Sequence, residues 1–349
     1  TFAALCGSFG LWVERPLLIG VLAMVVLLWV VEVPDSLVGR HPYISLSLLM
    51  WVWGNAHGTF ALGFAYLGLH VVGRWLDGAP PWAGLERRTV RATAVALACC
   101  FVNPYGFSLL TFPLHLLARG EILSVVKEWM SPDFHSLHGA LFGVWIVAFL
   151  VTLAIGRQRA TRRDVLVGVT FLMLGLWAIR NAGIAPLIGL PIAVRLLPAN
   201  RVRPDRRETL NWVALGLMFV IALNTAADAA GKDHYDLTDY PIAAMEVVER
   251  EGLLGRHLAT TDAWGAYVIH EYWPRQRVFM DDRYDMYPVA FSKDYIKLHG
   301  EEGWDKVLDR YEIDVIVWRN DKGLTQLLDL DPQWKRIHRD KLASVWVRV

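Results

Sequence analysis

Apolar residues form long, nearly uninterrupted runs in the first two thirds of the chain. A membrane-spanning helix needs roughly 20 such residues, and about 17 suffice. Two runs fall below that length and are expected to extend into their flanks or to form half-helices inside a bundle. The pattern therefore predicts a polytopic α-helical bundle of about eight spans: 16–33, 43–55, 57–73, 89–102, 139–156, 164–179, 182–198 and 209–226.

The last third has a different pattern, in which short apolar runs alternate with amphipathic segments. The runs predict strands, and the amphipathic segments, separated by glycines and an Asp-Pro pair, predict helices. Together they predict a small α/β domain over 227–349, after a transmembrane domain over 1–226. The expected strands are 257–261, 277–280, 313–318, 333–338 and 343–348, and the expected helices are 241–251, 263–272, 291–299, 302–311 and 323–330.

Composition and charge agree with this division. The chain of 349 residues is 54% hydrophobic, only 20% charged, and has a net charge of +1. That near-neutrality hides 18 Lys/Arg against 11 Asp/Glu in 1–226, and 17 against 23 in 227–349. A single soluble globule, a disordered chain and a nucleic-acid binder are unlike this composition. We expect membrane lipids and no nucleic acid among the partners.

Arginine sets the predicted orientation. The connections around 40, 74–91, 157–164 and 199–208 carry 13 Arg, whereas the opposite ends of the spans carry four Arg/Lys. Positive connections stay in the cytoplasm. The chain is therefore predicted to be a multi-pass protein of the cell inner membrane, with 227–349 extracytoplasmic.

Polar interruptions of the apolar pattern gather on the predicted outer side. They include an outer-face loop over 103–138, whose apolar stretch 107–118 predicts an interfacial helix. Polar residues at membrane depth are costly and usually line a cavity or site. The clusters predict an extracytoplasmic site, unless they are ordinary turns with interfacial aromatic anchors. They are Glu14-Arg15, 53–58, 103–106, Lys127-Glu128-Trp129, Ser131-Pro132-Asp133 and Arg180-Asn181.

Metal and disulfide chemistry have little support in the sequence. The three cysteines, Cys6, Cys99 and Cys100, lie in apolar stretches without metal-ligand spacing, and no metal site is predicted. The acidic stretch 281–285 could hold a hard cation, but an acidic turn neutralised by Arg283 is favoured.

In their order along the chain, several fragments resemble the membrane glycosyltransferases of the GT-C fold. That superfamily includes protein O-mannosyltransferases, aminoarabinose-lipid transferases and the catalytic subunit of oligosaccharyltransferase. The resemblance covers nearly the whole chain and rests on Glu14-Arg15-Pro16, Trp53-Gly54-Asn55-Ala56-His57-Gly58, Asn103-Pro104-Tyr105-Gly106, the stretch 128–134, Arg180-Asn181, the stretch 262–267 and the stretch 278–283.

The resemblance implies transfer of a sugar from a polyprenyl-phosphate donor to a glycan, lipid or protein acceptor at the outer membrane face. It implies an inverting displacement, in which a carboxylate activates the acceptor and cations stabilise the departing phosphate. A divalent cation is left open as a cofactor. The candidate catalytic residues are Glu128 and Asp133, and the candidate substrate-binding residues are Arg15, Asn55, His57, Asn103, Tyr105, Arg180 and Asn181.

One departure from the family pattern keeps alternatives open. The family's catalytic Asp lies in the first extracytoplasmic loop, whereas this sequence starts at Thr1 within an apolar segment. We expect an N-terminal part to be missing; otherwise Glu128 or Asp133 acts instead, or the protein is a non-catalytic binding or assembly protein of the envelope. A lipid or solute carrier is less expected than either, because the span interiors are nearly free of charge and no internal repeat is seen.

Overall fold

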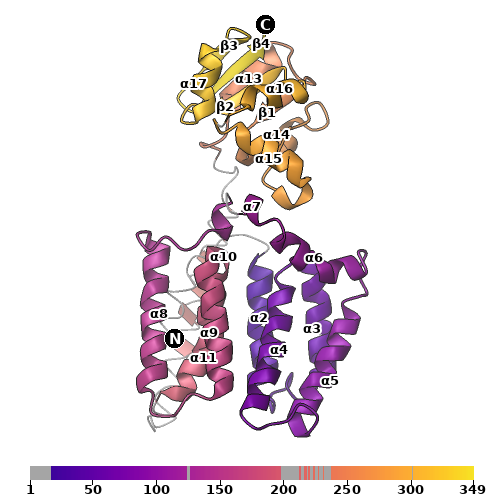
Figure 1. Ribbon diagram of the computed structural model, residues 1–349, viewed down its shortest axis with the longest axis vertical. Coiled ribbons are helices and arrows are strands. Elements are labelled where there is room, and N and C mark those ends of the chain that lie inside the picture. Colours follow the sequence, from indigo (N-terminus) through magenta and orange to yellow (C-terminus); the bar gives the residue numbers. More distant parts are fainter. Residues whose placement is uncertain are drawn as a thin grey trace. The chain divides into compact units, whose positions relative to one another are not determined.

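The structure, a computed structural model, describes residues 17–123, 126–197, 237–300 and 302–349, together with a few positions between 212 and 231. The chain divides into two compact units, Thr1–Arg201 and Val202–Val349. The first is helical and the second combines helices with one small sheet (Figure 1). The predicted boundary at 226/227 falls where few residues are described, and it stays a prediction.

The helical unit contains helices at seven of the eight predicted spans. Residues of the eighth, 209–226, are described at only a few positions, which are helical. The predicted interfacial segment 107–118 is also a helix. The elements are α2 (Leu17–Glu32), α3 (Pro42–Ala56), α4 (Phe60–Leu76), α5 (Gly84–Cys99), α6 (Phe107–Leu117), α7 (Gly120–Leu123), η2 (Lys127–Trp129), α8 (Leu137–Ile155), α9 (Arg162–Trp177), α10 (Ile179–Ala182) and α11 (Ile184–Leu196).

Two helices, Leu137–Ile155 and Ile179–Leu196, are long and apolar enough to cross a membrane, among the residues described. The apolar helices α2, α4 and α6 are shorter than such a span. The eight-span bundle is therefore not established by helix length. Many large apolar side chains nevertheless face outward, including Leu22 and Val144 at 65% and 61% exposure. Such a surface is unusual for a soluble protein.

Aromatic rings fitted against glycines hold α8, α9 and α11 together. Phe142, Trp145 and Phe149 of α8 stack in a row, with ring centroids 5.8 and 5.1 Å apart. A Cβ at Gly168, Gly175 or Gly189 would lie only 2.6–2.8 Å from these rings. The helices approach closely because these positions have no side chain, as is common where helices pack within membranes.

The helical unit has two ends, which we name by an arginine at each. The Arg163 end contains the segments 33–41, 77–83 and 156–161, and the Arg180 end contains residues 57–59, 100–106, α6, η2 and α10 (Figure 1). Helix α9 separates them, since Arg163 lies in its first turn and Arg180 lies just beyond its last residue. At about 1.5 Å per residue, its 16 residues hold the two ends about 24 Å apart.

The second unit is an α/β domain, as predicted. Its sheet has the order β1-β2-β4-β3, with β1 and β2 parallel and the other pairs antiparallel. Its elements are α13 (Ile242–Arg250), β1 (Leu258–Thr260), α14 (Asp262–Tyr272), η3 (Tyr284–Met286), α15 (Val289–Lys297), α16 (Trp304–Arg310), β2 (Val315–Arg319), α17 (Gly323–Leu330), β3 (Trp334–Arg339) and β4 (Ala343–Arg348).

Alternating residues of β2 place helices on both faces of the sheet. Val315 and Val317 pack in one core with residues of α13 and α14. Ile316 and Trp318 pack in a second core with residues of α15, α16 and α17. Because successive strand residues point to opposite faces, this assignment gives a three-layer sandwich.

The predicted strand at 277–280 is wrong. The segment has no strand partner and instead lies against α14, where a Cβ at Gly265 would sit 2.2 Å from the Met280 carbonyl oxygen. Before it, the buried Gln276 side chain donates to the carbonyls of Arg256 and Arg277. Side-chain hydrogen bonds therefore replace the strand ladder here.

The acidic stretch after this segment forms a turn neutralised by arginine. The Asp281 carboxylate, 1% exposed, accepts hydrogen bonds from Nε and Nη2 of Arg283. Burial favours a higher pKa for Asp281, but the hydrogen bonds and charge of Arg283 outweigh it and lower that pKa. The described residues contain no group of three or more His, Cys, Asp or Glu suited to a metal ion.

Candidate functional site

At the Arg180 end, α10 and η2 bring a cation and an aromatic ring together. The guanidinium carbon of Arg180 lies 4.5 Å from the centroid of the Trp129 ring. The Ile179 amide donates to the Met130 carbonyl at 2.9 Å, which fixes the segment that follows η2 beside α10. Glu128 precedes Trp129 in the same short helix, so the candidate carboxylate and the candidate cation occupy contacting elements.

His57, in the turn between α3 and α4, is held by a chain of three hydrogen-bonding groups. The Trp53 indole donates to the Thr59 hydroxyl at 3.0 Å, and this hydroxyl lies 2.9 Å from Nδ1 of His57. Indole N–H is only a donor, so the Thr59 hydroxyl accepts from Trp53 and donates to Nδ1. The Thr59 backbone amide also donates to Nδ1 at 3.2 Å. Nδ1 is therefore the acceptor, and Nε2 carries the proton.

The charge of Arg180 reaches His57. Burial is the main cause that lowers the pKa of His57, and the positive charge of Arg180 lowers it further. A neighbouring charge acts on a pKa only over a short distance. His57 therefore lies within electrostatic reach of Arg180 at this end, although 123 positions separate them in the sequence. A neutral His57 has an N–H donor at Nε2.

Other predicted site residues hold their own turns and helix ends. Asn103 donates to the Gly106 carbonyl at 3.3 Å and accepts from the Tyr105 amide at 2.7 Å. The Asn55 amide donates to the Trp51 carbonyl, one helix turn earlier, and that of Asn181 donates to the Leu174 carbonyl, seven residues earlier. Amide side chains often satisfy nearby backbone groups in this way.

The two candidate carboxylates differ in their surroundings. Asp133 accepts from the His135 amide at 2.9 Å, and its carbonyl oxygen accepts from the Ser136 hydroxyl, so it organises the entry to α8. Glu128 lies next to Trp129, against which Arg180 packs. Tyr105 is 73% exposed. Arg15 lies outside the described residues, as does the side chain of Lys127.

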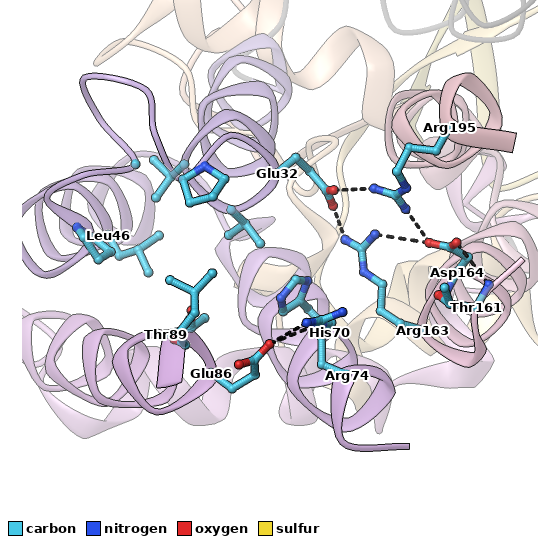
Figure 2. Close-up of a pocket in the computed structure, with 16 residues that line it drawn as sticks. Glu32, Leu46, His70, Arg74, Glu86, Thr89, Thr161, Arg163, Asp164 and Arg195 are labelled. Atoms are coloured by element: carbon cyan, nitrogen blue, oxygen red, sulfur yellow. Dashed lines mark hydrogen bonds and ion pairs between the residues drawn. The ribbon is translucent and has the colours of Figure 1, made fainter. Parts of the chain in front are cut away.

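The opposite end of the helical unit contains a cavity of about 340 Å³ that was not predicted from the sequence (Figure 2). It lies among the ends of α2, α4 and α11 and the starts of α3, α5 and α9. Apolar and ionisable side chains share its walls. The lining residues are Val30, Val31, Glu32, Pro34, Gly39, Pro42, Leu46, His70, Arg74, Leu85, Glu86, Thr89, Thr161, Arg163, Asp164 and Arg195.

One wall is a closed network of ion pairs. Arg163 binds Glu32 and, at 3.3 Å, Asp164, while Arg195 binds the same two carboxylates, with its Nη1 2.6 Å from Glu32. The Tyr66 hydroxyl donates to Glu32 at 2.6 Å and accepts from Arg163 at 2.8 Å. Figure 2 shows the two arginines reaching both acids from separate helices. This network ties α2, α4, α9 and α11 together.

A second ion pair lines the cavity apart from this network. Arg74 of α4 donates to one oxygen of Glu86 of α5 from both Nε, at 3.0 Å, and Nη2, at 2.8 Å. Arg74 is 43% exposed and Glu86 13%. A Cβ at Gly73 would lie 2.5 Å from the Arg163 Cα, so this glycine allows α4 to approach α9 beside the cavity.

The sequence contained a weak signal for this cavity. Glu32 ends an apolar run, and Tyr66 and His70 are four residues apart, which places them on one helix face. Nothing in the sequence paired Glu32 with Arg163, 131 residues away. The ion pairs of this network lie near the ends of α2, α9 and α11, and the expectation that the protein is not a carrier stays a prediction.

No protein-family model matches the chain, and no match to it is found among the curated proteins.

Proposed function

We propose that this chain is a membrane glycosyltransferase-like protein of the GT-C class, using a polyprenyl-phosphate-linked sugar at the extracytoplasmic membrane face. In this proposal the helical unit is a bundle of about eight membrane spans. Its Arg180 end faces the outside of the cytoplasm, and the α/β unit is extracytoplasmic as well. The exposed apolar side chains of the helical unit and its two long apolar helices support a membrane location.

The packing of Arg180 on the Trp129 ring, with His57 within electrostatic reach of the guanidinium, is the observation that carries the proposal. These three residues come from segments far apart in the chain, and the sequence had already grouped them on one side. A lipid phosphate is bound well by the planar guanidinium of an arginine, which donates two parallel hydrogen bonds, together with further N–H donors. Arg180 and the Nε2–H of a neutral His57 supply such groups.

In the proposed reaction, an acceptor oxygen attacks the anomeric carbon of the donor sugar. The bond from that carbon to the lipid-phosphate oxygen breaks, and the acceptor proton passes to a carboxylate. Within this chain, the contact between η2 and α10 favours Glu128 over Asp133 for that role. Arg180 and His57 stabilise the charge on the departing phosphate.

Substitution of Arg180 by lysine tests donor binding. Lysine keeps the charge but lacks the planar fork, so we expect affinity for polyprenyl phosphate to fall about tenfold in Arg180→Lys, with thermal stability unchanged. Arg119→Lys is the matched control, since it makes the same change at another arginine on the predicted outer side. Binding is measured by titrating the purified chain in detergent with polyprenyl phosphate.

Two results would count against the donor role. Unchanged binding in Arg180→Lys indicates that Arg180 only anchors the interface, because either cation reaches the headgroup layer. Loss of stability in Arg180→Ala, restored by also replacing Glu128 or Asp133 with its amide, indicates a structural tie between the loop and the bundle.

A further inference from the structure

We infer that the cavity at the Arg163 end binds the headgroup of a zwitterionic aminophospholipid, with its phosphate at Arg74 and Arg195 and its ammonium at Glu86. The inference rests on the membrane location in the proposed function but not on glycosyl transfer. About 340 Å³ falls within the range of small-ligand sites, roughly 300–1,000 Å³.

The charges around the cavity favour a ligand with both signs. Three arginines and three carboxylates line it, and every arginine is paired with at least one carboxylate. A purely anionic headgroup would bring negative charge beside Glu32, Glu86 and Asp164. A headgroup with one phosphate and one ammonium keeps the cavity neutral and offers an opposite charge to each member of a pair.

Side chains that line the cavity retain unused hydrogen-bonding capacity. Arg74 uses Nε and Nη2 on Glu86, which leaves the Nη1 donors of its guanidinium for another acceptor. Among the residues that the structure describes, Nε of Arg163 and Nδ1 of His70 are buried without a hydrogen-bond partner, and Arg163 is only 4% exposed. Buried polar atoms usually find partners, so such atoms in a cavity wall indicate a site for a polar ligand.

The walls also suit the apolar part of a lipid. Val30, Val31, Leu46 and Leu85 line the same cavity as the ion pairs, and Leu85 is 50% exposed. Arg74 and Arg195 are about two-fifths exposed, whereas Arg163 is buried, so the accessible cations lie at the opening and the buried one lies deeper. A headgroup can therefore reach charged partners while its glycerol contacts leucine and valine.

Lipid retention measures this binding directly. The full chain is reconstituted in nanodiscs of equal parts phosphatidylethanolamine and phosphatidylglycerol, extracted into detergent, and analysed by native mass spectrometry for retained lipid. We expect phosphatidylethanolamine to be enriched about tenfold over phosphatidylglycerol, and Arg74→Gln or Glu86→Gln to abolish that enrichment. Arg87→Gln, an exposed position on α5 outside the cavity lining, should keep it.

A steric variant provides a second test in case Arg74→Gln or Glu86→Gln, which break the ion pair, unfold the chain. Thr89→Leu adds bulk at the cavity wall without changing any charge, and we expect the same loss of phosphatidylethanolamine. Equal or greater retention of phosphatidylglycerol, or enrichment that persists in all three cavity variants, overturns the inference and leaves a structural ion cluster. Polyprenyl-phosphate binding at Arg180 is measured separately, so failure of either proposal is distinguishable.

Discussion

At the scale of single residues, the polar side chains of the helical unit fall into two groups. Asn55, Asn103 and Asn181 satisfy backbone groups of their own turns or helix ends. His57 and Arg180, far apart in the sequence, instead lie within electrostatic reach of each other, and Glu32 and Arg163 form an ion pair at the other end. Polar groups at membrane depth are costly, so interactions between polar residues far apart in the sequence indicate function better than hydrogen bonds within one turn.

His57 should make the stability of the chain sensitive to mild acid. Its pKa in the folded protein lies below 6.5, so the folded state resists protonation while the unfolded state accepts it. The stability due to neutral His57 is complete above pH 6.5 and is lost as pH falls toward the folded-state pKa. Between about pH 7.5 and pH 5.5, the melting temperature in detergent should fall more for the native chain than for His57→Gln.

The comparison with His57→Gln separates this residue from the other ten histidines. Glutamine offers an acceptor to Thr59 and a donor elsewhere but does not titrate in this range. Equal pH dependence in the two proteins would show that His57 is not held neutral by burial and by Arg180.

At the scale of helices, contacts at glycines hold the Arg180 end in place. A Cβ at Gly20 of α2 would lie 2.2 Å from the Thr59 hydroxyl, the central group in the chain from Trp53 to His57. A Cβ at Gly63 of α4 would lie 2.7 Å from the ring of the fully buried Trp53. These two glycines thus allow α2 and α4 to pack closely against the hydrogen-bonded turn between α3 and α4.

Gly20→Ala should destabilise the chain by about 1–3 kcal/mol, because the new methyl group displaces the Thr59 hydroxyl. Gly68→Ala in α4 is the matched control. A Cβ there meets nothing within 4 Å, so helix propensity should stabilise that variant by up to about 1 kcal/mol.

Both glycine variants are compared by thermal unfolding in one detergent. Polyprenyl-phosphate binding is then measured for both variants at one temperature, chosen 20 °C below the lower of the two unfolding midpoints. Weaker binding in Gly20→Ala would show that loss of the Thr59 contact also weakens the site. Equal stability of Gly20→Ala and Gly68→Ala would contradict the packing of α2 against Thr59.

At the scale of the whole molecule, the arginine distribution predicts which side each connection faces. Asp321→Cys in the α/β unit should react with a membrane-impermeant thiol reagent in intact cells, since residue 321 is 65% exposed. Gln158→Cys, between α8 and α9, is exposed and belongs to an arginine-rich connection. It should react only after lysis.

The chain without either substitution gives the background from its own cysteines. Labelling of position 158 in intact cells, or of position 321 only after lysis, would reverse or abolish the proposed topology. Labelling of both positions in lysates also confirms that each cysteine is accessible to the reagent.

The sequence by itself determined where most elements lie. Long apolar runs gave the helices of the first unit, and short alternating runs gave four of the five predicted strands, because local periodicity follows from local backbone geometry. The strand predicted at 277–280 failed because an apolar run does not reveal whether a neighbouring strand edge is available. There, the backbone of α14 at Gly265 occupies the adjoining space.

Only the tertiary structure decided which polar residues meet. The sequence grouped Trp129 and Arg180 by side, but the packing of one on the other depends on how η2 and α10 pack. It gave no pairing for Glu32 with Arg163, nor for Arg74 with Glu86, and so it missed the cavity that they line. The physical reason is that charge pairing is set by distance in space, which helix packing fixes and sequence separation does not.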